Sequence, residues 1–497
     1  MPIALVLALL LPGRTFTASL HVGAGYTYPT ISAAVAVVQP GDTIEIHSGT
    51  YPGGLFFANL QGTPAHWITI RAAPGETASI MGGSNAIQLS DPAYLHIKSL
   101  IFYGQTGNGF NLDDGGNYDT PAHHIIFNAC QFRDMAATGN NDLLKLSGLD
   151  DFEIRNCAFL NGAAGGSGID MVGCHRGTII GNWFENMGSN AIQAQGGTEY
   201  IRIERNFFRN CGQRTLNLGG STGLAFFRPD TAHFEAARLQ VYSNIIIGSV
   251  AAVAYVGCVE VDVANNTIYR PERWVLRILQ ETVDPDRFLE CGDNRFVNNI
   301  VVRDAGLSTE TNIGPNTRPE TFTFSHNLWY HNSNPNWSGP SIPTPDPAMI
   351  VNQNPLLANP EAGNGDCHIP VGSPAAGAGL ALTDPERDYY GYPYSTSRSI
   401  GAAQAVSPTS VAGPDANAAF FAYPNPFFGE LQLKLPDEAA GRFRLRVFGP
   451  DGRLVAAGSV AEVLAGAGNW PEGLFVLVLE NLEGGAVYRC WVMRGVK

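Results

Sequence analysis

One polar position recurs in a series of short, strand-like segments. The segments LLKLSGL, GIDMVGC, AIQAQGG and TLNLGGS, which begin at residues 143, 168, 191 and 215, can be aligned by their glycines. In a strand, a residue between two inward apolar positions points to the opposite face. Along the chain this outward column reads Asn111, Lys145, Asp170, Gln193, Asn217, Ala254 and Arg277. We call this column the outer stripe.

The cations of the outer stripe could act as a base or bind a carboxylate. A lysine or arginine that is crowded by other cations has a lowered pKa and can act as a base. The planar guanidinium of an arginine can grip a carboxylate. The competing interpretation is that outward strand residues are polar only because they meet water. At about 4.8 Å per coil, Lys145 and Arg277 also lie several coils apart.

Two long intervals in the sequence can build walls beside the outer stripe. They contain residues 219–238 and 270–287, and long insertions in a repeat protein tend to gather on one face. We expect a wall on which sugars stack, formed by Phe226, Phe227, Arg228 and Trp274. The same region holds the carboxylates Glu235, Glu272 and Glu281, and two of them facing across a groove would indicate hydrolysis.

These segments belong to a loose repeat. Its register marks are Leu100, Cys130, Cys157, Asn182, Asn206, Asn244, Asn266, Asn299 and Asn327, at intervals of 22 to 38 residues. The runs between the marks alternate with period two, so each unit consists of strands and turns. A repeat of this length predicts a solenoid in which each coil buries its apolar side against its neighbours.

The recurring asparagines predict a ladder. Asparagine tolerates the left-handed conformation at a sharp turn, and its amide can bond to the asparagine of the next coil. We expect Asn182, Asn206, Asn244, Asn266, Asn299 and Asn327 to stack in one ladder or two, with Cys130 and Cys157 as small fillers in the same column.

Composition limits the possible partners. The chain has 497 residues, a net charge of -14 and a pI near 5.2, which argues against nucleic acid but permits a local basic groove for an anionic polysaccharide. None of the eight cysteines forms a C-x-x-C pair, so zinc has no support. His123 and His124 are assigned to a turn. Asp113 and Asp114 can bind calcium or make a turn, and the turn is preferred.

The repeat resembles the pectate-lyase-like right-handed parallel β-helix superfamily. The segment Tyr28 to Tyr51 is similar to its N-terminal cap, in which a short helix precedes the first coil, and residues 384–404 are similar to its closing segment. The resemblance covers roughly residues 20–404. It predicts an all-β fold, a right-handed parallel β-helix, but hardly limits activity, because this fold carries lyases, hydrolases, epimerases and adhesins.

Lyases of this superfamily act on uronic acids, and the resemblance gives the stripe residues roles. Lys145 is the candidate base, while Arg277 and the turn residue Arg214 would grip a carboxylate. Asp170 would hold Lys145 or join a metal site, calcium being the possible cofactor, and Gln193 and Asn217 would bind substrate. We therefore expect a monomeric polysaccharide lyase. A noncatalytic glycan-binding surface protein and a glycoside hydrolase are the alternatives.

The two ends of the chain predict export. Residues 1–18 have a short apolar run followed by small residues, as a signal peptide does, and no later segment is apolar enough to cross a membrane. After a linker at 405–417, residues 418–497 predict a small antiparallel β-sandwich. It resembles the type IX secretion sorting domain and implies a secreted or surface location, with the type IX machinery as partner. An accessory carbohydrate-binding sandwich is the alternative.

Overall fold

The structure is a computed structural model that describes residues 17–307, 309–363, 365–405, 421–423, 431–434, 443–448, 454–470, 473–481 and 487–494. Nearly all of the proposed signal peptide and linker lies outside these residues.

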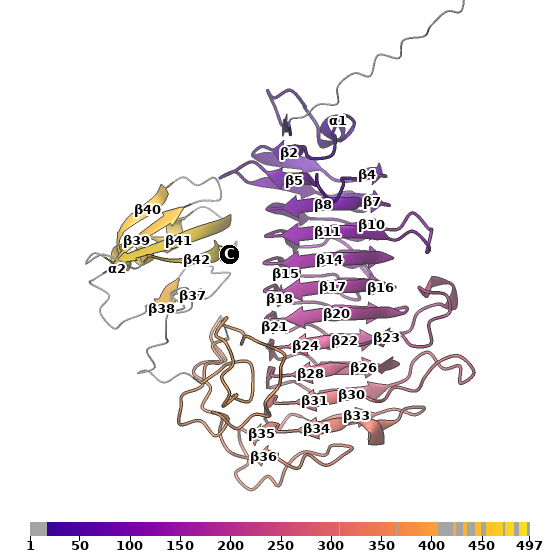
Figure 1. The fold of residues 1–497 in the computed structure, drawn as a ribbon, viewed down its shortest axis with the longest axis vertical. Coiled ribbons are helices and arrows are strands. Elements are labelled where there is room, and N and C mark those ends of the chain that lie inside the picture. The colour runs from indigo at the N-terminus through magenta and orange to yellow at the C-terminus, as the bar shows by residue number, and fades with distance from the viewer. Residues whose placement is uncertain are drawn as a thin grey trace, which may run out of the picture.

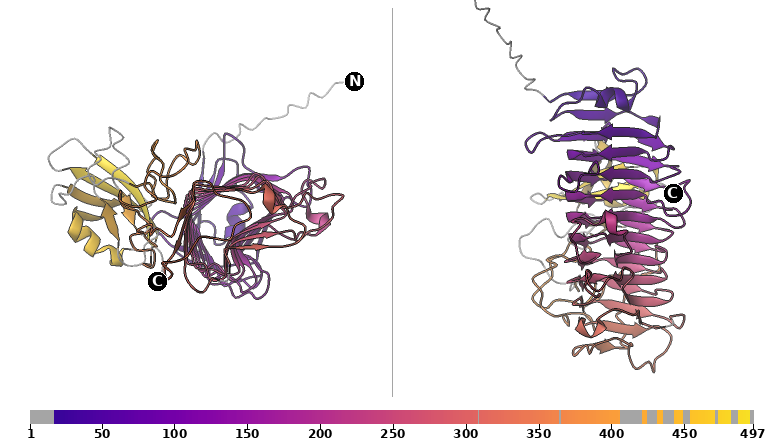
Figure 2. Two further views of the ribbon diagram at one scale, coloured as in Figure 1. Left: turned by 90° about the horizontal axis from the view of Figure 1, so that it is seen from below. Right: turned by 90° about the vertical axis from the view of Figure 1, so that its right-hand side faces the viewer.

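The main body is a solenoid of three parallel sheets (Figure 1). Each coil passes through sheet A, then sheet B, then sheet C, and viewed along its axis the coils stack around one apolar core (Figure 2). The predicted right-handed parallel β-helix is confirmed.

In the described part of the chain the three sheets contain 14, 12 and 10 strands. The strands of sheet A are β1 (Ser19–Val22), β2 (Thr43–Ile46), β5 (Ile68–Ala72), β8 (Ala93–Lys98), β11 (Ala122–Asn128), β14 (Leu149–Arg155), β17 (His175–Ile180), β20 (Thr198–Glu204), β23 (Ala236–Ala237), β24 (Gln240–Tyr242), β27 (Cys258–Val259), β28 (Asp262–Ala264), β31 (Arg295–Val297) and β34 (Thr323–Ser325). Those of sheet B are β3 (Gly49–Pro52), β6 (Ala78–Met81), β9 (Leu100–Tyr103), β12 (Gln131–Arg133), β15 (Ala158–Leu160), β18 (Trp183–Glu185), β21 (Phe207–Arg209), β25 (Ile245–Ile247), β29 (Thr267–Tyr269), β32 (Ile300–Arg303), β35 (Leu328–His331) and β36 (Ile350–Val351). Those of sheet C are β4 (Leu55–Ala58), β7 (Ile87–Ser90), β10 (Phe110–Asp113), β13 (Leu144–Ser147), β16 (Ser167–Val172), β19 (Asn190–Gln195), β22 (Arg214–Gly219), β26 (Ala251–Val256), β30 (Trp274–Leu279) and β33 (Thr311–Ile313).

The predicted asparagine ladder is confirmed as a single column. The Nδ2 of each asparagine from Asn182 to Asn299 donates to the Oδ1 of the next, over 3.0 to 3.2 Å. The same Oδ1 atoms accept the backbone N–H of the preceding asparagine over 2.8 to 2.9 Å. Every member is buried, so the ladder satisfies backbone groups that water cannot reach. Cys157 continues the column, since its backbone N–H donates to the Oδ1 of Asn182.

The left-handed turn lies one residue earlier than predicted. The residue before each ladder asparagine has a positive φ, for example 66° at Gly181, 54° at Arg205 and 56° at Asn265. The ladder residues are therefore chosen for their amides, because the preceding residue supplies the bend.

Replacing Asn266 with alanine is expected to lower the free energy of unfolding by about 2–4 kcal/mol. The fully buried backbone N–H of Asn244 would lose its acceptor, and each such unsatisfied group costs about 1–3 kcal/mol. Chemical denaturation measures the change. Asn111→Ala, on the partly exposed outer face of sheet C, is the control and should change it by less than about 1 kcal/mol. Equal losses in both variants would contradict the structural role of the ladder.

The outer face of sheet B is closed by the loop that follows β36. Trp183, Phe207 and Ile245 point outward and pack against Cys367 and Ala402 of that loop. Sheet C instead carries the predicted polar stripe on its outer face, so this face can meet a polar ligand.

The N-terminal helix is confirmed as α1 (Ile31–Val35), which Thr30 caps by accepting the N–H of Ala33. The C-terminal part is a small antiparallel β unit, with strands β37 (Phe421–Tyr423), β38 (Gln432–Lys434), β39 (Phe443–Phe448), β40 (Leu454–Ser459), β41 (Gly473–Asn481) and β42 (Val487–Arg494). It also contains a helix that the strand alternation did not predict, α2 (Val460–Ala465), which begins at a capping box formed by Ser459 and Glu462.

Candidate functional site

The outer stripe is confirmed residue by residue. Parallel pairing aligns Asn111 with Lys145, then Asp170, Gln193, Asn217, Ala254 and Arg277 in successive strands of sheet C. The column continues to Gln88 at one end and to Asn312 at the other. Its two cations nevertheless lie five strands apart, about 24 Å, so they form two separate polar groups.

The first group surrounds Lys145. Its ammonium contacts the carboxylate of Asp170 and lies 3.9 Å from that of Asp142. Gln195 donates to Asp170 over 3.1 Å. Burial by itself lowers the pKa of Lys145, but the attraction of the two carboxylates outweighs burial and leaves that pKa above its ordinary value. The charged groups that act on Lys145 in the described part of the chain are carboxylates, so this geometry does not favour its predicted role as a base.

Asp142 gives this group a pH dependence. Burial and the nearby Asp170 raise the pKa of the Asp142 carboxyl to about 7, against the attraction of Lys145. The folded state therefore holds this proton more tightly than the unfolded chain, and its contribution to stability is lost as the pH rises from about 4 to about 7.

We expect Asp142→Asn to remove that loss, so that the variant gains stability relative to the unmodified protein between pH 5 and pH 8. Denaturant unfolding at the two pH values measures the difference. Asp134→Asn, at an exposed carboxylate, should show the same change in the free energy of unfolding between the two pH values as the unmodified protein. If Asp142→Asn also shows that change, Asp142 is not the group that titrates.

The second group surrounds Arg277, at the other end of the stripe. Its Nε donates to Asn312 over 3.0 Å, and its guanidinium lies 4.5 Å from the centre of the Trp274 ring. Arg273 lies 4.1 Å from the same ring centre. Burial and the nearby Arg214 and Arg273 lower the pKa of Arg277, which Glu281 opposes. The crowding by cations that a base requires is thus found at Arg277 and not at the candidate base Lys145.

Arg214 belongs to this second group. Its guanidinium donates to Asn217 over 3.0 Å and to Glu281 over 2.5 Å. Asn217 in turn donates to Gln193 over 3.2 Å. The structure therefore places five predicted residues in one region of sheet C: Gln193, Asn217 and Arg214 are joined by hydrogen bonds, and Arg277 contacts Trp274 nearby. We call Arg214, Arg273, Trp274 and Arg277, with Glu281, the arginine cluster.

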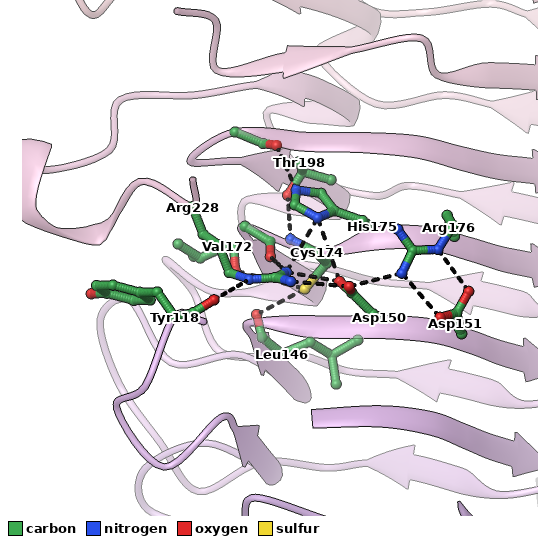
Figure 3. Close-up of polar contacts among 12 residues, drawn as sticks. Tyr118, Leu146, Asp150, Asp151, Val172, Cys174, His175, Arg176, Thr198 and Arg228 are labelled. Atoms are coloured by element: carbon green, nitrogen blue, oxygen red, sulfur yellow. Dashed lines mark hydrogen bonds and ion pairs between the residues drawn. The ribbon is translucent and has the colours of Figure 1, made fainter. Parts of the chain in front are cut away.

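Arg228 is placed elsewhere (Figure 3). It lies in the insertion at 219–238, is 7% exposed, and grips both oxygens of Asp150 over 2.7 and 3.0 Å. Its guanidinium also donates to the carbonyls of Gly173 and Tyr118 and to the Nδ1 of His175. The predicted contact with sugar is not available to a side chain with these partners. Arg228 instead fastens the insertion to the coils.

The rest of the predicted wall is divided. Phe226 is 62% exposed, in the short helix η1 (Leu224–Phe226), whereas Phe227 is buried against Phe288. In Figure 1 the loops that follow β10, β22 and β30 project from the same edge of sheet C. Of the two phenylalanines, only Phe226 is therefore exposed to a ligand on this edge, because Phe227 belongs to the core.

The three predicted carboxylates do not form a facing pair. Glu235 is 1% exposed and accepts hydrogen bonds from Gly196, Thr222 and Thr282. Glu281 pairs with Arg214, and Glu272 lies in the turn that connects sheet B to sheet C. Glu235 therefore ties the two insertions together, and the arrangement does not favour hydrolysis by paired carboxylates.

No described group of three or more His, Cys, Asp or Glu side chains is arranged to hold a metal. Asp142 and Asp170 are joined through the Lys145 ammonium, so they do not fit calcium. Asp113 and Asp114 accept the N–H groups of Gly115 and Gly116, which supports the predicted turn. His123 and His124 lie within β11, not in a turn. Cys130, Cys157, Cys174, Cys211, Cys258, Cys291 and Cys367 are buried free thiols.

Sequence reasoning missed Arg273, Asn312, Asp142 and Gln195. Extending the stripe by one coil would have found Asn312, which pairs with Arg277 across β30 and β33. Arg273, Asp142 and Gln195 lie at strand ends and corners, where the alternation of the strand does not predict which way a side chain points.

The three sheets and the polar outer face define the class of the chain: it is a right-handed parallel β-helix protein. Residues 85–268 match the family model described as right handed beta helix region. No helix in the described residues has the length and apolar character to span a bilayer.

The chain is similar to several solved structures, and the first of those below supports the fold. The pectate lyase Pel9A is 14% identical, with a TM-score of 0.53, over 79% of this chain and 98% of that chain. An alginate lyase from Paenibacillus sp. str. FPU-7 is 18% identical, with a TM-score of 0.38, over 62% and 99%. A GH136 lacto-N-biosidase from Eubacterium ramulus is 13% identical, with a TM-score of 0.41, over 67% and 68%. No curated protein matches the chain.

Proposed function

We propose that this chain is a polysaccharide lyase that cleaves a uronic-acid-containing glycan by β-elimination on the outer face of sheet C. The observation that carries the proposal is the arginine cluster on the outer face of sheet C, where Arg273 and Arg277 flank the Trp274 ring and Arg214 already holds a carboxylate. Burial and the neighbouring cations also lower the pKa of Arg277. β-Elimination needs a base for the C5 proton beside cations that neutralise the uronate carboxylate. The arginine cluster holds several cations close together, and Arg277 is the member that could serve as the base.

Arg214 is the group that would receive the uronate carboxylate. In the structure its guanidinium holds the carboxylate of Glu281, so Glu281 stands for the anionic group that a substrate would bring. Exchange of one carboxylate for another keeps the charge of Arg214 paired during binding. Arg277 in its neutral form then takes the C5 proton, a C4=C5 double bond forms, and the C4–O bond breaks. The leaving oxygen takes a proton from water, and the hydroxide that remains takes the proton from Arg277.

The experiment uses the purified chain with alginate, pectin, polygalacturonate, chondroitin and heparin, with and without calcium. A rise in the ultraviolet absorbance of unsaturated uronates is the expected result. New reducing ends without that absorbance would instead indicate a hydrolase. Binding without either product would indicate a noncatalytic glycan-binding protein.

The proposal includes export to the cell surface or beyond by a type IX secretion machinery. The residues at the two ends of the chain support it through their resemblance to a signal peptide and a sorting domain. Replacing residues 418–497 with a stop codon in the native host should leave the protein inside the cell envelope.

A further inference from the structure

A hollow of about 580 Å³ opens at the corner between sheets B and C. Its lining residues Arg270 and Glu272 come just before the arginine cluster in the sequence. It is formed where β21, β25, β29 and β32 end, together with part of the loop after β36. The residues that decide its chemistry are Arg209, Tyr269, Arg270, Glu272, Asp304 and Glu361.

The cations of the hollow are already occupied. Arg270 donates to Asp304 over 2.8 Å and to Glu361 over 2.5 Å. Arg209 donates to the carbonyl oxygens of Gly363 and Ala362. The hydroxyl of Tyr269 is also used, since it donates to Glu361 over 3.0 Å. A carboxylate that entered the hollow would be the fourth beside two guanidiniums whose donors are already bound, whereas in the arginine cluster it would meet an excess of guanidiniums.

The acceptors of the hollow are in excess. Three carboxylates, Glu272, Asp304 and Glu361, face two guanidiniums, so the lining has a net negative charge. Glu272 is exposed, and its side chain has no hydrogen bond or ion pair with the rest of the described chain. The hollow thus offers free oxygen acceptors to hydroxyl or amine donors and repels anions.

The neighbouring arginine cluster has the opposite charge, with three guanidiniums against the one carboxylate of Glu281. Glu272 is followed directly by Arg273 and Trp274. At about 3.3 Å per residue, Glu272 and Arg277 are at most about 17 Å apart along the chain. One oligosaccharide of several residues can therefore touch both patches.

We infer that the hollow is a second carbohydrate subsite, which takes a neutral or amino sugar, and that the substrate is a heteropolymer in which such a sugar adjoins a uronic acid. The inference rests on the proposed function and deepens it. It predicts that the protein disfavours polymers made only of uronic acid, because one of their carboxylates would have to enter the acidic hollow.

The test compares heteropolymers, namely unsulfated chondroitin and rhamnogalacturonan, with the homopolymers polygalacturonate and polymannuronate. We expect the full chain to prefer at least one heteropolymer by tenfold or more in kcat/KM. Glu272→Lys should lower that preference by about fivefold to tenfold, because the lining then carries a net positive charge and accepts a uronate. Glu386→Lys is the matched control: it makes the same charge change at an exposed glutamate away from the hollow and should leave the preference unchanged.

Calorimetric binding to the Arg277→Ala protein separates this inference from the lyase proposal. If no polymer is cleaved but binding of a heteropolymer still depends on Glu272, the lyase proposal fails and the subsite stands. If homopolymers are cleaved as well as heteropolymers, and Glu272→Lys behaves like Glu386→Lys, the subsite is overturned and the lyase proposal stands.

Discussion

Arg277→Ala is expected to lower the rate of unsaturated uronate release by about 10²–10⁴-fold, the usual contribution of a general base. The other arginines of the cluster stay in place, so binding of the polymer should weaken much less than the rate. Steady-state absorbance and calorimetric binding give the two quantities. Arg318→Ala, at a half-exposed arginine that pairs with Asp293 on the surface, is the control and should retain full activity.

The pH profile distinguishes a base from a structural cation. Because the pKa of Arg277 is lowered but starts from a high ordinary value, activity should rise with pH into the alkaline range. Arg277→Lys should keep part of the activity and move the rising limb to lower pH, since the ordinary pKa of lysine is about two units or more below that of arginine. An unchanged profile in Arg277→Lys would show that residue 277 is not the base.

Arg228→Ala is expected to lower the free energy of unfolding by about 3 kcal/mol and to release the insertion at 219–238. The change leaves the buried carboxylate of Asp150 without the guanidinium that lowers its pKa against the effect of burial, and breaking a buried ion pair costs about 3–5 kcal/mol. Arg176 keeps part of the compensation by donating to Asp150 over 2.8 Å. Chemical denaturation and the rate of proteolytic cleavage within residues 219–238 measure the two effects.

A second arginine that binds Asp150 supplies the control. Arg176 contacts the same carboxylate, but its side chain is 51% exposed, so Arg176→Ala should cost no more than about 1 kcal/mol. The double variant Arg228→Ala with Asp150→Asn should lose less than the two single variants together, because the two residues interact directly. If Arg176→Ala is as costly as Arg228→Ala, burial is not the source of the effect.

The stripe and the ladder could be derived from the sequence because both are properties of one repeated position. A parallel coil places residue after residue in the same column, so a correct alignment of Lys145, Asp170 and Asn217 is also a correct register. The ladder of Asn182 to Asn327 follows from the same reasoning, since equivalent amides lie one strand spacing apart.

The pairing of charges could not be derived in this way. Asp170 contacts Lys145, as one of its two predicted roles requires. The predicted role of Lys145 as a base needs neighbouring cations, yet Asp142 reaches it from a corner that strand alternation does not describe. Arg228 was assigned to a sugar-binding wall because it lies in a long insertion. The insertion turns back along the helix, so the side chain is buried beside Asp150.

The sequence by itself therefore determined the coil, its inward and outward columns and the sheet on which the polar stripe lies. These features follow from period-two alternation and from stacking, which are repeated in every coil. Only the tertiary structure decided which cation is paired and which is crowded. The pKa of Arg277 depends on Arg214, two strands away, and on Arg273 and Glu281 at the corners. Electrostatic interactions act through space and depend on burial, and neither the distance nor the burial of these groups is written in their sequence spacing.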